Sequence, residues 1–459
     1  MIRRDERLTP AALLPAIERM WTLSAERILG LEASWRPEDG APVVTVSGRY
    51  TARGWTEWTQ GFQFGSALLQ FDATGDAAFL ALGRERTLAR MAPHITHMGV
   101  HDHGFSNVST YGALRRLARE GRFEPPAGEA ALYDLALRCS AAVQARRWTP
   151  TADGGGFIYS FNGPHSLFAD TIRSLRSLAL GHLLGHALLE ERDRRVSLLG
   201  RLLAHARATA RWSVYYGEGR DIYDVRGRVA HESLFDTLDG AYRCPSTQQG
   251  YSPFTTWTRG LAWIMLGYAE ELELVASLPD ADLEPEGGRL AVEADLLRPA
   301  RAACDHYIET TPADGVPYWD TGAPGLAAMP GWADRPADPG NPHEPVDSSA
   351  AAIAAQGLLR LGRLLASTDP EAATRYTGAG LAIARTLLAA PYLCEQPIHQ
   401  GMLLHSVYHR PNGWDYVPPG ASAPRGEASQ WGDYHLRELA LLLGRIARSQ
   451  PYYTFFGPA

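Results

Sequence analysis

Apolar residues recur with a helical period along almost the whole chain, and this pattern predicts about twelve amphipathic helices. Their lengths, roughly 12 to 25 residues, are those of ordinary globular helices. The pattern therefore predicts an all-α protein. The expected helices begin near Thr9, Gly61, Asp76, Asn107, Gly128, His165, Asp193, Pro253, Gly288, Asp347, Pro370 and Gln430.

Long loops rich in glycine, proline, tryptophan and tyrosine follow every second predicted helix, at about residues 36–58, 213–256, 310–346 and 411–430. Long loops in a compact protein are usually functional. The alternation predicts paired helices wound into a closed toroid, with the loops gathered at one end. An open solenoid would give a similar pattern, but the chain shows no repeat of fixed period such as the familiar helical solenoids have.

The composition favours one large body over several domains. A chain of 459 residues with 45% apolar and 21% charged residues has ordinary globular values and can build a sizeable core. A length of this size fits two or three average domains or one closed architecture. We expect a single domain spanning residues 1–459.

Charge and cysteine usage narrow the class of partner. The net charge is −7 and the basic residues, all arginine, form no cluster, so nucleic acid is not expected as a partner. No stretch approaches membrane-spanning length, and the N-terminus lacks an apolar leader, which predicts a cytoplasmic protein without a membrane partner. The four cysteines are widely scattered without CxxC spacing, so we expect no metal. A homo-oligomer remains compatible with the composition.

Tryptophans and tyrosines concentrate in or beside the long loops, Trp58, Tyr159, Trp257, Trp319 and Trp414 among them. Any one of them could simply plug the centre of the barrel. Together they exceed what plugging requires. Flat aromatic faces match the apolar faces of pyranose rings, and the pattern therefore predicts a cleft for a small oligosaccharide.

Two aspartates lie in apolar and aromatic surroundings, Asp102 within residues 99–105 and Asp170 within residues 168–173. Desolvation in such surroundings can raise the pKa of a carboxyl group toward the range that suits proton transfer. The simpler interpretation is that Asp102 begins a turn and Asp170 caps a helix. The aromatic residues and motifs further along the chain favour the interpretation of Asp102 and Asp170 as a catalytic pair.

Six sequence blocks, in order along the chain, resemble the signature blocks of glycoside hydrolase family 88, the unsaturated glucuronyl hydrolases. The resemblance runs from about residue 55 to residue 443, and six ordered blocks are far more specific than any single one. It implies an (α/α)6 barrel that needs no metal or organic cofactor. The blocks are Trp58-Thr59-Gln60-Gly61-Phe62, His101-Asp102-His103-Gly104-Phe105, Thr256-Trp257-Thr258-Arg259-Gly260-Leu261-Ala262-Trp263, Gly315-Val316-Pro317-Tyr318-Trp319-Asp320, Asp347-Ser348-Ser349-Ala350-Ala351-Ala352-Ile353-Ala354 and Trp431-Gly432-Asp433-Tyr434.

The chemistry that this resemblance implies is the addition of water to a vinyl ether. Members of the family act on the C4=C5 double bond that polysaccharide lyases leave on a terminal uronic acid. Protonation of C4 gives an oxocarbenium-like cation at C5, water attacks C5, and the resulting hemiketal opens and releases the aglycone. By motif position Asp170 is the acid and base, and Asp102 holds the sugar hydroxyls and tunes its partner. Two negative charges in one cleft should raise one pKa, which suits a general acid.

The resemblance also assigns substrate contacts. Trp58 is expected to stack on the unsaturated ring. His101 either hydrogen-bonds the substrate or orients Asp102. Arg259 either pairs with the uronate carboxylate or forms an internal salt bridge with Asp102 or Asp347, and Asp347 is expected to cap a buried helix. The further expected substrate contacts are Gln248, Trp263, Trp319, Ser429 and Trp431.

Two departures from the family pattern concern specificity. Thr-Gln-Gln-Gly at residues 247–250 replaces Thr-His-Gln-Gly, so Gln248 stands for an imidazole, and Leu261 stands for a glutamine. Three hypotheses follow: a hydrolase of unsaturated uronyl oligosaccharides, a glycosidase on a different and perhaps saturated uronide, or a sugar-binding protein without activity. The presence of both aspartates favours an enzyme over a sugar-binding protein. The sequence does not determine the uronide, the linkage or any sulfation.

Overall fold

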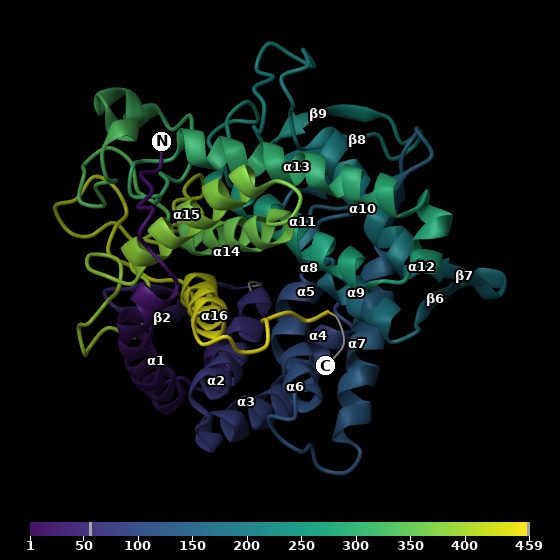
Figure 1. The fold of residues 1–459 in the computed structure, drawn as a ribbon, viewed down its shortest axis with the longest axis horizontal. Coiled ribbons are helices and arrows are strands. Elements are labelled where there is room, and N and C mark those ends of the chain that lie inside the picture. The colour runs from purple at the N-terminus through teal and green to yellow at the C-terminus, as the bar shows by residue number, and fades with distance from the viewer. Residues whose placement is uncertain (55–56, 457–459) are drawn as a thin grey trace.

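The computed structural model describes residues 1–54 and 57–456, and its helices form two concentric rings. Six helices make the outer ring, of which α1, α3 and α7 lie along the outer side in Figure 1. They are α1 (Leu14–Ser34), α3 (Ala77–Arg90), α7 (Glu129–Arg146), α10 (Leu198–Trp212), α13 (Arg289–Thr310) and α15 (Pro370–Leu387).

The inner ring also has six positions, two of which are divided into short helices. α2 (Gln60–Thr74), α11 (Thr258–Ser277), α14 (Ser348–Leu365) and α16 (Gln430–Ala447) each fill one position. α5 (His103–Ser106), a π-helical turn (Val108–Gly112) and α6 (Ala113–Arg119) fill another, and α8 (Thr171–Ser174) with α9 (Arg176–Leu183) fill the last. Contacts run from α2 through these elements to α16 and back to α2, which closes an (α/α)6 barrel.

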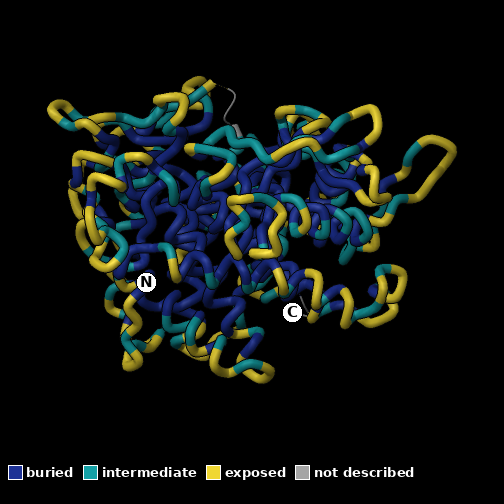
Figure 2. Tube along the Cα trace, turned by 90° about the horizontal axis from the view of Figure 1, so that it is seen from above, coloured by how far each residue is buried: buried dark blue, intermediate teal, exposed yellow. Residues whose placement is uncertain are grey.

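Burial separates the two rings. In α11 every residue from Thr258 to Val275 is buried, and α14 and α16 are buried on almost every side. In the outer helix α3 the buried residues are Phe79, Gly83 and Thr87, which lie on one face. Figure 2 shows the same division, with buried chain in the interior and exposed loops around it.

The twelve predicted helices correspond to the twelve positions of the barrel. Eleven of the predicted starts lie within about five residues of the observed ones, as boundaries read from sequence normally do. The helices expected near His165 and Asp193 begin later, at Thr171 and Leu198. Short strands occupy the intervening residues in both cases.

The strands form four small antiparallel sheets in the loops. They pair as β1 with β2, β3 with β4, β6 with β7, and β5 with β8 and β9. None of the helices in the described part of the chain is long and apolar enough to cross a membrane. The strands are β1 (Pro42–Val46), β2 (Arg49–Ala52), β3 (Trp148–Pro150), β4 (Gly156–Ile158), β5 (Ser166–Phe168), β6 (Ala187–Glu190), β7 (Arg194–Ser197), β8 (Glu232–Phe235) and β9 (Tyr242–Ser246), and the short helices α4 (Ala92–Ile95) and α12 (Asp280–Leu283) complete the elements.

Candidate active site

A cavity of about 160 Å³ opens where the inner helices begin. Because the N-terminal end of a helix carries positive potential, this end of the barrel favours a negatively charged ligand. The residues that line this cleft are Trp58, Val100, His101, Asp102, Phe105, Phe161, Asp170, Gln248, Gln249, Trp257, Arg259, Trp263, Tyr408, His409, Asn412 and Trp414.

Asp102 and Asp170 both lie at the N-cap position of an inner helix, but neither side chain accepts a capping hydrogen bond. Asp347, at the same position of α14, accepts hydrogen bonds from the backbone N–H groups of Ser349 and Ala350, as its sequence context predicts. The interpretation of Asp102 and Asp170 as ordinary caps is therefore wrong. Their carboxylates face the cleft instead.

Gly104 brings the two aspartates together. A Cβ atom at this position would lie 2.1 Å from the carbonyl oxygen of Ser174, so only glycine allows α5 and α8 to pack this closely. The Gly104 N–H donates to Ser174 Oγ over 2.9 Å, and Arg176 donates to the Gly104 carbonyl over 2.9 Å. These contacts fix the start of α5 against the end of α8 and the start of α9.

His101 lies between the two carboxylates. Its Nε2 is 3.4 Å from Asp170 Oδ2 and 3.8 Å from Asp102 Oδ1. Burial acts to lower the pKa of His101, but the charge of Asp102 and the hydrogen bond to Asp170 outweigh it, so that the pKa is raised. The imidazole is thus able to hold a proton between the carboxylates.

The two carboxyl groups differ in their pKa. Burial, above all, raises the pKa of Asp102; His101 opposes the shift and the charge of Asp170 adds to it. Burial acts in the same direction on Asp170, but the hydrogen bond and charge of His101 outweigh it, and the pKa of Asp170 is lowered. The expected raised pKa therefore belongs to Asp102 and not to the predicted acid. Of the two carboxyl groups, Asp170 has the lower pKa.

One oxygen of Asp170 is unused within the protein. Asp170 Oδ1 is buried and has no hydrogen-bond partner among the described residues. Buried polar atoms are normally paired, so an orphan that belongs to a cavity-lining side chain indicates a ligand. Asp170 Oδ1 is available to a ligand in the cleft.

Aromatic rings form one wall of the cleft. The Trp58 ring stacks on Trp431, with centroids 5.2 Å apart and planes at 25°, and it contacts Phe105 and Phe62 by its edge. Trp263 packs against Phe105 at 4.9 Å. This packing holds Trp58 in one orientation, with a face suited to a sugar ring.

Arg259 belongs to the cleft through an internal ion pair. Its Nη1 lies 2.9 Å from Asp347 Oδ2, and both side chains are buried. Its Nη2 donates to Gln249 Oε1 over 2.9 Å and to the Tyr408 carbonyl over 2.7 Å. Of the two interpretations from the sequence, the salt bridge to Asp347 is the one that the structure contains.

Gln248 lines the cleft, and an imidazole that the sequence did not indicate lies beneath it. His231 Nδ1 accepts the backbone N–H groups of Gln248 and Gln249 at 3.0 and 3.2 Å. The His231 ring packs between Phe168 and Trp257. Burial lowers its pKa to about 4, so it is neutral at physiological pH.

His231 reaches the site through strand pairing. The Ala169 N–H donates to the His231 carbonyl over 2.9 Å, which places His231 beside the residue that precedes Asp170. The pairing of β5 with β8 joins segments that lie more than sixty residues apart in the sequence. No local motif marks such a residue.

Four positions from the sequence interpretation lie outside the cleft lining. Trp319 donates its indole N–H to Glu344 Oε2 over 2.8 Å, Ser429 Oγ accepts the Gly432 N–H as the N-cap of α16, and Trp431 lies buried behind Trp58. These three residues are therefore not positioned to contact a ligand in the cleft. Leu261 is absent from the residues that line the cleft and is fully buried in the hydrophobic core, so its interpretation as a replaced cleft residue is wrong.

The loop from Tyr408 to Trp414 forms the remaining side of the cleft. Sequence reasoning listed Trp414 among the aromatic residues but did not identify His409 or Asn412. Asp415 shapes this loop, because its carboxylate accepts the backbone N–H groups of Tyr408 and His409. The loop joins α15 to α16, and its place over the cleft follows from the closure of the ring.

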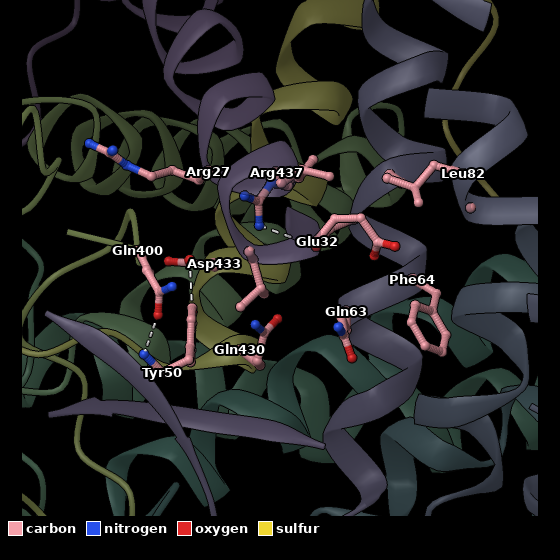
Figure 3. Close-up of a pocket in the computed structure, with 15 residues that line it drawn as sticks. Arg27, Glu32, Tyr50, Gln63, Phe64, Leu82, Gln400, Gln430, Asp433 and Arg437 are labelled. Carbon is pink, nitrogen blue, oxygen red and sulfur yellow. Dashed lines mark hydrogen bonds between the residues drawn. The ribbon is translucent and has the colours of Figure 1, made fainter. Parts of the chain in front are cut away.

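A second, smaller cavity lies among α1, α2, α3 and α16 and shares no lining residue with the cleft (Figure 3). Asp433 borders it and accepts hydrogen bonds from Tyr50 and from the backbone N–H groups of Met402 and Leu403. The last sequence block is thus structural at this residue. Within residues 1–54 and 57–456, no group of three or more potential metal ligands comes together.

No family model matches the chain. Comparison with known proteins does identify relatives, and their names agree with one another. The unsaturated glucuronyl hydrolase of Bacillus sp. strain GL1 is 28% identical over 432 residues, covering 93% of this chain and 97% of that protein. The unsaturated chondroitin disaccharide hydrolase of Streptococcus pyogenes serotype M1 is 25% identical, covering 96% and 94%. The crystal structure of the Bacillus sp. GL1 unsaturated glucuronyl hydrolase superposes with a TM-score of 0.70 at 24% identity, covering 96% of this chain and 98% of that chain, which establishes the fold.

Proposed function

We propose that this chain, which belongs to glycoside hydrolase family 88, adds water to the C4=C5 double bond of a terminal unsaturated uronic acid and so releases it from an oligosaccharide. The observation that carries the proposal is the pair of cleft carboxylates, Asp102 and Asp170, joined by His101 at 3.8 and 3.4 Å. Neither aspartate caps its helix, and Asp170 Oδ1 is free for a substrate.

In this mechanism Asp170 transfers the proton. An incoming uronate brings negative charge beside Asp170 and raises its pKa, so that the proton held by His101 moves across the 3.4 Å hydrogen bond to Asp170. The Asp170 carboxyl group then donates this proton to C4, and a cation develops at C5. Water attacks C5 and returns a proton to the Asp170 carboxylate, and the hemiketal opens to release the aglycone.

The other cleft residues bind and orient the substrate. Asp102, the carboxyl group with the raised pKa, binds the ring hydroxyls. Trp58 stacks on the unsaturated ring, and Trp263 and Gln248 bound the same site. Arg259 acts through Gln249, whose amide it orients by a 2.9 Å hydrogen bond.

Loss of the conjugated-alkene absorbance tests the reaction. The protein is incubated with unsaturated disaccharides produced by a polysaccharide lyase, and the absorbance is followed with time. A decay that depends on the protein supports hydration of the double bond. A constant absorbance, with or without sugar binding, would contradict it and favour one of the other two hypotheses from the sequence.

We also propose that residues 1–459 act as one catalytic unit in the cytoplasm, on a small oligosaccharide. The residues that line the cleft come from the first, middle and last thirds of the chain, from Trp58 to Trp414. No single third of the chain could therefore form the cleft alone. The four cysteines are unpaired and two of them, Cys304 and Cys394, are buried, which fits a reducing compartment.

A further inference from the structure

Arg147 is a buried arginine behind the cleft. It caps the C-terminal end of outer helix α7, is 5% exposed and does not belong to the cleft lining. All side-chain hydrogen bonds of Arg147 within the described chain go to backbone carbonyls, so none of them reaches a carboxylate. Arginines are almost never fully buried unless they are paired with an acid. This unpaired guanidinium is therefore a candidate for a role in the site in front of it.

The guanidinium of Arg147 holds together two separate segments of the chain. Its Nη1 donates to the carbonyl of Met98, four residues before Asp102. Its Nε and Nη2 donate to the carbonyls of Tyr159 and Ser160 over 3.2 and 2.7 Å. The centroid of the Tyr159 ring lies 4.2 Å from the guanidinium carbon, a cation–π contact that holds the planar group in place. One rigid fork thus links the segment that leads to Asp102 with a second segment.

The second segment leads directly to the catalytic imidazole. Phe161 follows Ser160 in the chain and lines the cleft. Its ring stacks on the ring of His101, with centroids 5.9 Å apart and planes at 21°. Arg147 therefore fixes, through the backbone, both the segment that carries Asp102 and the ring on which His101 lies.

The charge of Arg147 also acts on this pair. Burial raises the pKa of Asp102, and the charge of Arg147 opposes that shift, as the charge of His101 does. On His101, burial and the charge of Arg147 act to lower the pKa, against the two carboxylates that raise it. In return, burial lowers the pKa of Arg147, and Tyr159 and the charge of Asp102 oppose the shift. Arg147 and the catalytic cluster are therefore coupled electrostatically as well as through the backbone.

The other titratable groups that act on His101 and Asp102 are Asp170, His97, His205 and His231. Burial lowers the pKa of His205 to about 3 and that of His231 to about 4, so both are neutral near pH 7. His97 is half-buried and can lose its proton. Among these described groups, Arg147 is the one whose positive charge persists at every working pH.

We propose that Arg147 is a positioning residue of the catalytic cluster, which clamps the segments of Asp102 and Phe161 around His101 and supplies a fixed positive charge behind them. This inference rests on the proposed function, because it gives Arg147 a part in the geometry and the charge of that reaction. Arg147 acts through Asp102 and His101, since its side chain does not line the cleft.

A histidine titration tests the charge without relying on activity. The imidazole signal of His101, identified by its loss in His101→Gln, is followed against pH by NMR of the full chain. A positive charge disfavours protonation, so Arg147→Met should raise the pKa of His101, whereas Arg147→Lys keeps the charge and should leave it close to the wild-type value. Arg146→Met removes the same charge at the neighbouring exposed position and is the matched control. An unchanged His101 titration in folded Arg147→Met would overturn the inference.

Alkene loss tests the clamp. Arg147→Met and Arg147→Lys both lose the fork to three carbonyls, so kcat should fall by roughly 10- to 10²-fold in each. The basic limb of kcat/KM against pH should move to higher pH in Arg147→Met alone, and Arg146→Met should match the wild type in both measurements. Wild-type kcat in both Arg147 variants would overturn the inference. Reduced thermal stability with an unmoved basic limb in Arg147→Met would also overturn it, since a structural cross-link alone would give that result.

A second charge-free variant, Arg147→Gln, replaces Arg147→Met if the latter does not fold. If neither folds, a displaced His101 titration in Arg147→Lys would overturn the inference. Failure of the proposed function is distinguishable from these outcomes, because it appears as absence of alkene loss in the wild type, whereas the titration of His101 does not depend on turnover.

Discussion

Asp170 and Asp102 occupy the same kind of position in the chain, yet their surroundings shift their pKa values in opposite directions. The hydrogen bond from His101 keeps Asp170 ionised, whereas burial keeps the pKa of Asp102 raised. His101 acts to lower the pKa of both carboxyl groups, and they in turn raise the pKa of His101. Three predictions follow from the chemistry of individual side chains.

Asp170→Asn should abolish most of the activity while the fold persists. The amide keeps the size of the side chain but has no transferable proton, so turnover should fall by roughly 10²–10⁴-fold or more. The measurement is the rate of alkene loss, with thermal unfolding as the check on folding. Asp76→Asn, at the N-cap of outer helix α3, is the matched control and should retain activity. A folded Asp170→Asn protein with near wild-type turnover would refute the assigned role.

His101→Gln should move the basic limb of the pH profile to lower pH. The pKa of His101 lies above its ordinary value of 6.5, so the wild-type cluster keeps its proton until the pH rises through that raised pKa. Without the imidazole, the proton rests on carboxyl groups, which lose it at lower pH. The measurement is kcat/KM against pH, with exposed His343→Gln as the control. A basic limb at the same pH in both variants would show that His101 does not hold the proton.

The two departures from the family pattern should behave differently when reversed. Gln248 lines the cleft, so Gln248→His should raise kcat/KM on unsaturated glucuronyl disaccharides by adding a titratable partner for the substrate. Leu261 is buried in the core, and Leu261→Gln should instead lower the free energy of unfolding by about 1–3 kcal/mol, since its amide finds no partner there. Urea unfolding and alkene loss measure the two effects. Improved activity from Leu261→Gln would restore its interpretation as a cleft residue.

Among the secondary-structure elements, the short helices α5 and α8 decide where the carboxylates meet. Each has four residues, and each continues into a further helical segment of the same inner position. Their close approach depends on Gly104, whose backbone touches that of Ser174. The site is therefore sensitive to the distance between these two elements.

Gly104→Ala should separate α5 from α8 and reduce activity about 10²-fold, because a displacement near 1 Å misplaces catalytic groups by enough for such a loss. The new Cβ atom meets the Ser174 carbonyl oxygen at 2.1 Å, and a backbone atom cannot yield as a flexible side chain does. Alkene loss and thermal unfolding are measured together. Gly30→Ala in α1, where no atom lies within 4 Å, should be neutral or slightly stabilising. Full activity in Gly104→Ala would mean that the approach is not required.

At the scale of the whole molecule, the barrel separates catalysis from stability. The cleft occupies the N-terminal ends of the inner helices. Deeper along them lies a buried ion-pair network in which Arg173 pairs with Glu270 at 2.8 Å and with Glu438 at 3.0 Å. The chain end covers this network, since Tyr453 donates to Glu438 over 2.9 Å and its carbonyl accepts from Arg360.

Tyr453→Ala should destabilise the barrel without changing its chemistry. Removal of this fully buried ring should cost about 3–5 kcal/mol of unfolding free energy, while kcat at low temperature stays close to that of the wild type. Chemical denaturation and initial rates provide the measurements. Tyr453→Phe, which keeps the ring and removes the donor to Glu438, should cost less. A large loss of kcat in folded Tyr453→Ala would show that the two ends are coupled.

The sequence by itself determined the helical architecture, because a period of 3.6 residues in the apolar positions is a local property that each segment carries independently. It also pointed to Asp102, Asp170, Trp58 and Trp263 through blocks of neighbouring residues. All four line the cleft.

The tertiary structure decided everything that depends on contacts between distant segments. Strand pairing placed His231 beneath Gln248, ring closure placed the Tyr408–Trp414 loop on the cleft, and burial removed Leu261 from it. The opposite pKa shifts of the two aspartates were likewise beyond local reasoning, since a pKa depends on burial and on charges from many elements. Sequence carries the identity of these groups, but only the closed ring of helices fixes which of them meet.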